Sequence, residues 1–209
     1  MDHYVITIGR QFGSGGLEIG QKLAQKLGIE CYDKELLTVA AKESGLCEEL
    51  FHNHDEKPTN SFLYSLVMDT YSAGGYSGST YLDMPLNHRV FLAQFDAIKN
   101  LAKKESCIIV GRCADYALSD FERCAQVFVH ADDAFRINRL AEKYEWAEDK
   151  AKDMMKKTDK KRASYYNYYS NKKWGDAKSY HLTLDSSQIG TDGCVELILQ
   201  YLKLKNYIA

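Results

Sequence analysis

The chain of 209 residues is 45% hydrophobic and 27% charged, a composition that fits one substantial globular domain with room for a small inserted lobe. Its net charge of −2 creates no overall field that would draw the protein to nucleic acid or to a membrane surface. No apolar run approaches the ~18 residues of a membrane span and no signal segment precedes the first apolar run, so we expect a cytoplasmic protein with no membrane partner.

Five short apolar runs, typical of buried parallel strands, alternate with helical patterns along the chain. The alternation predicts an α/β fold, in which helices flank a parallel five-stranded sheet on both faces. We see no linker that would divide residues 1–209 into separate domains. The predicted strands lie at residues 5–8, 29–32, 107–110, 126–129 and 181–184.

The first run leads into a glycine-rich turn and then into an amphipathic helix. Glycines let several backbone N–H groups converge on one anion, and the helix N-terminus adds its dipole. We therefore predict that this turn binds phosphate. A standard P-loop has a lysine and a hydroxyl residue after its second glycine, but here Gly16 takes the place of the lysine and Glu18 that of the hydroxyl. A dinucleotide-binding motif would need a third glycine at position 18. Glu18 stands there, which argues against that kind of site. The turn residues are Gly13, Ser14, Gly15 and Gly16.

Asp33 follows the second apolar run, at a strand end of the kind where open α/β sheets bind ligands. Its carboxylate could meet an acceptor molecule, or it could cap the next helix. Residues 34–104 then show no clear strand, which predicts a helical insertion on the acceptor side. Within it we expect helices near residues 34–44, 61–71 and 86–104, and a Gly/Ser/Tyr-rich loop at residues 71–81.

Arg112 follows the third apolar run directly, so its side chain should reach the same edge of the sheet. A planar guanidinium can hold phosphate through two parallel hydrogen bonds. The alternative is a surface arginine that forms an ion pair with Asp115.

Basic residues are concentrated between Asp149 and Lys173, where nine Lys or Arg face three Asp. Such a segment favours an anionic ligand, and residues of about 145–175 could form a lid over transferred phosphate. A solvated charged helix is the plainer interpretation. Tyrosines lie among the basic residues, a pattern also found in proteins that bind single-stranded nucleic acid, but one such segment in a nearly neutral chain makes that partner unlikely.

Taken in order, these segments resemble the cytidylate kinase-like family, which is related to the P-loop nucleoside monophosphate kinases. The similarity implies a P-loop NTPase-type fold and extends over nearly the whole chain. It rests on residues 6–16, 32–36, 110–112 with Asp115, 129–131 with Arg136 and Arg139, Asp159 with Arg162, and residues 184–187.

The resemblance implies a role for each matching position. Gly13 to Gly16 would surround the donor phosphates of ATP. Asp33 and Arg112, together with Asp115, would lie at the acceptor nucleotide. The arginines that enter and form the lid, which would reach the transferred phosphate, are Arg136, Arg139 and Arg162.

The resemblance predicts transfer of a phosphoryl group from ATP, with Mg²⁺, to a nucleoside monophosphate, most simply CMP or dCMP. Loss of the P-loop lysine removes one electrostatic contact, which typically costs ~10²–10³ in rate. Arg10 is the candidate substitute cation, and Glu18 could hold Mg²⁺ through water. Two alternatives remain: a kinase for a different small phosphorylated acceptor, and a nucleotide-binding regulatory protein without catalysis.

Overall fold

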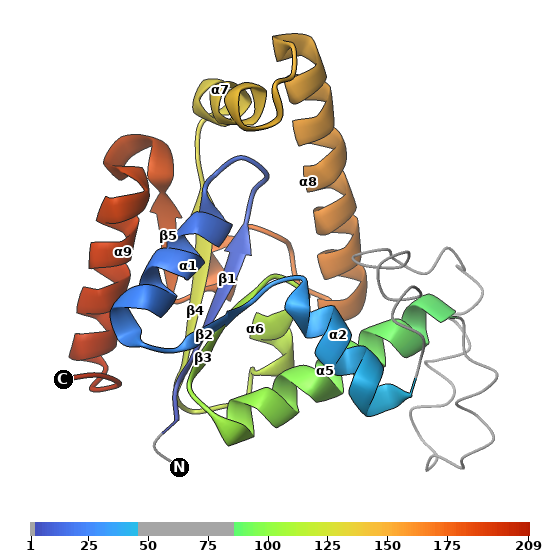
Figure 1. Cartoon of the computed structure of the whole chain (residues 1–209), viewed down its shortest axis with the longest axis vertical. Helices are drawn as coiled ribbons and strands as arrows, with labels where there is room; N and C mark the ends of the chain where they lie inside the picture. The colour runs from blue at the N-terminus through green and yellow to red at the C-terminus, as the bar shows by residue number, and fades with distance from the viewer. Residues whose placement is uncertain (1–2, 46–85) are drawn as a thin grey trace.

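The five apolar runs form the strands of one parallel sheet in the computed structural model, which describes residues 3–45 and 86–209 (Figure 1). The spatial order of the strands is β2-β3-β1-β4-β5, and each pair of neighbours is parallel. The helix expected at residues 61–71 and the loop at 71–81 lie outside the described residues. The strands are β1 (Val5–Arg10), β2 (Glu30–Tyr32), β3 (Cys107–Val110), β4 (Cys124–His130) and β5 (Leu182–Asp185).

Helices connect these strands in the expected alternation. The last helix begins at Ser186, directly after β5. Gly190 interrupts its helical backbone (φ 68°, ψ 175°), so the regular apolar pattern starts only after that residue. The described helices are α1 (Gly16–Leu27), α2 (Glu35–Ser44), α5 (Leu86–Lys104), α6 (Ala114–Ala117), α7 (Asp133–Tyr144), α8 (Glu148–Ser170) and α9 (Ser186–Leu204), with a short 3-10 helix, η1 (Ala177–Ser179).

Apolar side chains on both faces of the sheet explain why helices cover both. Consecutive residues of a strand point to opposite faces, so Val5 and Ile6 belong to different halves of the core. Helices α1 and α9 bury Ile19 and Ile198 against the face that carries Ile6. Helices α5 and α6 cover the opposite face (Figure 1). The carboxyl ends of the strands consequently open between these layers.

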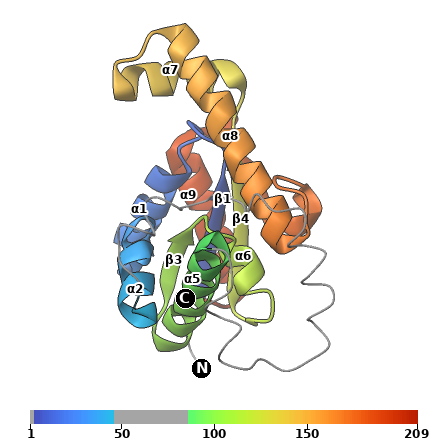
Figure 2. The same ribbon diagram turned by 90° about the vertical axis from the view of Figure 1, so that its right-hand side faces the viewer.

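Helix α7 and the first part of α8 extend beyond the carboxyl ends of the strands, and α8 then runs back along the molecule (Figures 1 and 2). A small apolar cluster, Ile137, Leu140, Ala151 and Met155, packs these two helices together, and Phe12 of the glycine-rich turn packs against it. This pair therefore lies over the phosphate turn, and α8 falls within the segment expected to be a lid. None of the described helices has the length and apolarity needed to cross a membrane.

Candidate functional site

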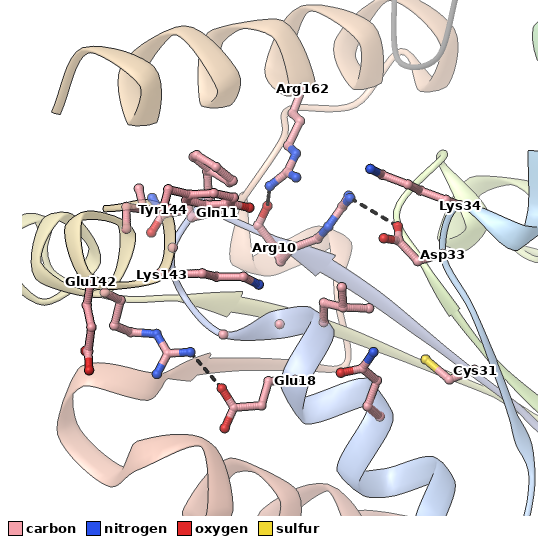
Figure 3. Close-up of a pocket in the computed structure, with 18 residues that line it drawn as sticks. Arg10, Gln11, Glu18, Cys31, Asp33, Lys34, Glu142, Lys143, Tyr144 and Arg162 are labelled. Atoms are coloured by element: carbon pink, nitrogen blue, oxygen red, sulfur yellow. Dashed lines mark hydrogen bonds and ion pairs between the residues drawn. The ribbon is translucent and has the colours of Figure 1, made fainter. Parts of the chain in front are cut away.

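A cleft of about 870 Å³ lies at the carboxyl ends of the strands, beside the glycine-rich turn (Figure 3). The turn and the start of α1 form one wall, and α7 forms another. Cys31 of β2, Asp33 and Lys34 just after that strand, and Arg162 of α8 complete it. Of the residues selected from the sequence, the cleft wall contains Arg10, Gly13, Gly15, Gly16, Glu18, Asp33, Arg139 and Arg162.

Left-handed glycines shape the turn. Gly13 has φ 85° and Gly15 has φ 83°, a backbone region that residues with a side chain adopt only with strain. Gly15 is the N-cap of α1 and supplies no side-chain cap, so the first turn of that helix faces the cleft. Ser14 is fully buried, and its Oγ donates a hydrogen bond to the Gln11 carbonyl at 2.9 Å. Ser14 thus holds the turn, and the helix N-terminus is available to an anion.

The position of Arg10 explains why a glycine replaces the usual P-loop lysine. A Cβ atom built on Gly16 would lie 2.5 Å from the Cβ of Arg10 and 3.0 Å from its Cγ. No side chain fits there unless one of the two residues moves. The Arg10 side chain therefore runs where a residue at position 16 would begin, and it brings a guanidinium to the cleft wall.

A carboxylate links two arginines from different strands. Asp33 forms an ion pair with Arg112 Nη1. Its Oδ1 also lies 3.8 Å from Arg10 Nη2 (Figure 3). Arg112 also donates to the Val110 carbonyl at 3.0 Å and is only 4% exposed. Arg112 thus pairs with Asp33 and not with Asp115, and Lys34, not Asp33, is the N-cap of α2. Arg112 is therefore not a surface arginine paired with Asp115, and Asp33 is not the cap of the next helix.

Glu18 anchors Arg139 at the other side of the turn. Its Oε2 accepts from Arg139 Nη2 at 2.7 Å, and its Oε1 accepts from Thr191 Oγ1 at 2.8 Å and lies 3.0 Å from Lys22 Nζ. Partial burial opposes ionisation of Glu18, but the hydrogen bonds from Arg139, Lys22 and Thr191 outweigh it and lower its pKa to about 2. Glu18 is therefore a carboxylate whose two oxygens are both engaged.

The other two selected arginines of α7 and α8 hold the turn from different sides. Arg136 is 4% exposed and does not line the cleft; it pairs with Asp159 and with Asp133, the latter at 2.7 Å. Asp159 accepts from the Phe12 N–H at 2.7 Å, so this pair fastens both helices to the turn. Arg162 Nη1 donates to the Arg10 carbonyl at 3.3 Å and lines the cleft (Figure 3).

Asp115 lies away from the main cleft, on a second and much smaller cavity. Its Oδ2 accepts from the Tyr166 hydroxyl at 2.6 Å. Burial raises the pKa of Asp115, although the bond from Tyr166 opposes this shift. The backbone before it is strained: Arg112 (φ 53°) and Cys113 (φ 55°) both adopt the left-handed conformation after Gly111. Such strain costs of order 1–3 kcal/mol per residue and is concentrated at functional sites.

Two lysines on the cleft wall had no role assigned from the sequence. Lys143 lies in the last turn of α7 and Lys34 at the start of α2, and both side chains border the cleft (Figure 3). Lys143 shares the polar face of α7 with Arg139, a signal that was visible in the sequence. Lys34 belongs to the segment 32–36 that carries the family resemblance, but no role was assigned to it.

The described residues contain no cluster of three or more His, Cys, Asp or Glu side chains that could hold a metal ion. The carboxylate predicted to contact Mg²⁺ through water, Glu18, has both oxygens occupied by cationic and hydroxyl donors. These residues therefore do not form a protein cage for Mg²⁺. In kinases, however, this ion is bound by only one or two carboxylates together with substrate phosphates.

Comparisons with known proteins agree on the fold. Residues 5–188 match the sequence profile of the cytidylate kinase-like family. An uncharacterized protein from Eubacterium ventriosum ATCC 27560 is 30% identical over 96% of this chain and 99% of its own, with a TM-score of 0.71. Shikimate kinase from Bacteroides thetaiotaomicron is 13% identical over 96% of this chain and 98% of its own, with a TM-score of 0.54.

A second shikimate kinase, from Acinetobacter baumannii and solved in complex with shikimate, is 15% identical over 99% of this chain and 96% of its own, with a TM-score of 0.50. At such low identities these two enzymes show the fold alone, which is that of the P-loop kinases. No curated protein matches the chain.

Proposed function

The chain belongs to the cytidylate kinase-like family, and we propose that it transfers the terminal phosphoryl group of ATP to a nucleoside monophosphate, most simply CMP or dCMP. The observation that carries this proposal is the pair of arginines, Arg10 and Arg112, that meet at Asp33 beside the phosphate turn. Phosphoryl transfer between two anionic molecules depends on cations that neutralise the phosphates, and these two arginines would contribute to that.

On the donor side, the phosphates of ATP would bind to the turn from Gly13 to Gly16 and to the N-terminus of α1. Backbone N–H groups and the helix dipole stabilise negative charge there without any side-chain movement. Arg10 would replace the missing lysine as the cation at the donor phosphates, because its side chain occupies the space where a side chain at position 16 would begin. Arg139 and Arg162 border the same cleft and would neutralise charge as it develops.

On the acceptor side, Arg112 would hold the phosphate of the nucleoside monophosphate through two parallel hydrogen bonds. Asp33 keeps this guanidinium in place. The attacking oxygen of such an acceptor is already anionic, so the transfer needs no general base. In an in-line displacement this oxygen bonds to the γ-phosphorus of ATP while the bond to the β,γ-bridging oxygen breaks, and ADP leaves.

Arg136 is a positioning residue in this proposal, because its pair with Asp159 fixes α7 and α8 to the turn without reaching the cleft. Magnesium, when bound with ATP, supplies further neutralisation of the phosphates. It would be held chiefly by the nucleotide, and Glu18 could contribute only through water.

The test is ADP formation from ATP and Mg²⁺ with a panel of nucleoside monophosphates, next to the same assay with Arg112→Ala. We expect turnover with CMP or dCMP that the variant loses. Shikimate belongs in the panel as the non-nucleotide acceptor, since two proteins of similar fold are shikimate kinases. Turnover of shikimate alone would replace the proposed acceptor and keep the phosphotransferase reaction.

The rival function is a nucleotide-binding protein that has lost catalysis with its lysine. Arg10→Ala separates the two, because a catalytic Arg10 should change turnover more than it changes ATP affinity. We expect kcat to fall by ~10²-fold or more, as for loss of one transition-state contact, with a smaller change in the Kd for ATP. Binding of ATP without turnover of any acceptor, in both the native protein and the variant, would favour the rival.

A further inference from the structure

A second cavity, of about 20 Å³, is lined in part by Arg112, the residue proposed to hold the acceptor phosphate. Its volume is that of about one water-sized group. Arg10 and Arg162 line both this cavity and the main cleft, so the two share a wall. We call it the side pocket; its polar and aromatic lining includes Arg112, Asp115, Tyr165, Tyr166, Trp174 and Tyr180.

The side pocket contains buried polar groups that are not all paired. The Tyr166 hydroxyl donates to Asp115 at 2.6 Å, and these side chains are 5% and 6% exposed. The Tyr180 side chain is 8% exposed, and its hydroxyl completes no well-formed hydrogen bond among the described residues, although the Tyr166 hydroxyl and the Gly175 backbone are its polar neighbours. Buried hydroxyl groups are rarely left without a partner, because the lost contact with water is then not replaced. The Tyr180 hydroxyl is therefore positioned to bind a group that enters the pocket.

The lining restricts what that group can be. A phosphate is too large for a space of about 20 Å³, although Arg10, Arg112 and Arg162 line it, and a smaller anion would lose its hydration and meet the Asp115 carboxylate. A methyl group would leave the Tyr180 hydroxyl unpaired. A hydroxyl fits the volume, can accept from Tyr180, and can donate to a carboxylate such as Asp115.

We propose that the side pocket binds a sugar hydroxyl of the phosphoryl acceptor, through Tyr180 and Asp115. The inference rests on the proposed function, in which Arg112 holds the acceptor phosphate. Arg112 also lines the side pocket, so the group that enters must lie close to that phosphate. In a nucleoside monophosphate the nearest hydroxyl groups are those of the ribose. The side pocket thus makes the acceptor site selective for the sugar and not only for the base.

The experiment compares CMP, dCMP and dideoxy-CMP as acceptors for the native protein and for Tyr180→Phe, which removes a single hydroxyl. Tyr165→Phe is the matched control: Tyr165 lines the same pocket, but its hydroxyl donates to Gln94 at 3.2 Å. We measure kcat and KM for each acceptor at saturating ATP. For one neutral hydrogen bond, Tyr180→Phe should reduce the preference for the nucleotide that carries the recognised hydroxyl by ~3–10-fold. The nucleotide pair whose ratio changes identifies that hydroxyl, and Tyr165→Phe should leave all ratios unchanged.

Three other outcomes overturn the inference. If Tyr180→Phe changes all three acceptors equally, the side pocket contains a structural water or only supports α8. If Tyr165→Phe changes the same ratio to the same degree, the effect comes from packing and not from the Tyr180 hydroxyl. If the native protein turns over none of these nucleotides, the proposed function fails first and the inference fails with it. Thermal unfolding of both variants checks that each is folded, so that an unchanged ratio counts against the inference.

Discussion

The donor turn and the acceptor side of the cleft prepare for an anion in different ways. At the turn, residues 10–18 present backbone N–H groups and the start of α1, and the arginine that replaces the lysine comes from the adjoining strand end. On the acceptor side, Arg112 is already paired with the carboxylate of Asp33, 79 residues earlier in the chain. A phosphate at the turn meets dipoles that are fixed by the backbone, whereas a phosphate at Arg112 must share that arginine with Asp33. The donor site should accordingly be rigid, and the acceptor site should exchange ionic partners on binding.

The largest effect that separates the two sides is expected from Arg112→Ala. Removing the guanidinium takes away a phosphate contact and an ion-pair partner of Asp33, so kcat/KM for the acceptor should fall ~10²–10³-fold. The Kd for ATP, measured by calorimetry, should change little because Arg112 does not line the main cleft. Arg112→Lys, which keeps the charge but not the planar fork, should recover only part of the loss. An equal loss of ATP affinity would mean that the two sides are not separate.

Gly16→Ala tests whether the Arg10 side chain excludes a side chain from position 16 of the donor turn. A Cβ at position 16 would lie 2.5 Å from the Arg10 Cβ, and such overpacking typically costs about 1–3 kcal/mol, or roughly 5- to 150-fold in the unfolding constant. The matched comparison is the same change in an Arg10→Gly background, where the opposing Cβ is absent and the cost should largely disappear. Urea unfolding of the four proteins gives the coupling free energy. Additive effects would show that Arg10 is not what excludes a side chain from position 16.

The two sides also differ in how far the sequence could predict them. Each predicted strand matches within two residues, and the turn was identified, because both depend on neighbours in the chain. The pairing of Asp33 with Arg112 depends on β2 and β3 lying side by side, and no local pattern indicates it. The resemblance gave Arg136 and Arg139 the same role at the transferred phosphate, yet of these two only Arg139 lines the cleft, since Arg136 pairs with Asp159 of α8.

The side pocket shows the same limit. Asp115 was selected because it follows a strand, but its partner Tyr166 lies 51 residues later, on α8. Tyr180 was not selected at all, because a tyrosine before a strand is not distinctive in a chain with 15 tyrosines. Long-range packing, and not residue type, makes its hydroxyl a candidate ligand.

A moderate effect is expected from Asp33→Asn, which removes the negative charge that pairs with Arg112 and lies near Arg10. Inorganic phosphate, used as a probe of that site without ATP, should bind more tightly by on the order of 10-fold, since one partly screened unit charge close to the anion is removed. Turnover of CMP should nevertheless fall, because Arg112 loses the group that orients it. Phosphate affinity is measured by calorimetry, with Arg112→Ala/Asp33→Asn as the control that lacks the acceptor cation. Unchanged phosphate affinity in Asp33→Asn would contradict the exchange of ionic partners.

The smallest effect concerns how the contribution of the Glu18 ion pairs, on the donor side, to the stability of the fold depends on pH. The pKa of Glu18 in the folded protein is about 2, below its ordinary value of 4.5. Its ion pairs therefore stabilise the fold fully above about pH 4.5, and this contribution is lost as the pH falls through about 2. Because the Glu18 side chain is 40% exposed, solvent screening should limit the contribution to under ~1 kcal/mol.

The measurement for Glu18 is the urea midpoint of the native protein and of Glu18→Gln between about pH 6 and pH 2. The variant should be slightly less stable at the upper end and should converge on the native protein at the lower end, and the difference should shrink in high salt. Glu142→Gln alters an exposed carboxylate on the same cleft and controls for the change in net charge. A gap that persists at low pH would mean that Glu18 supports the turn by packing. In that case the ion pairs of Glu18 would not stabilise the donor turn, and of the two carboxylates only Asp33 would act through its charge.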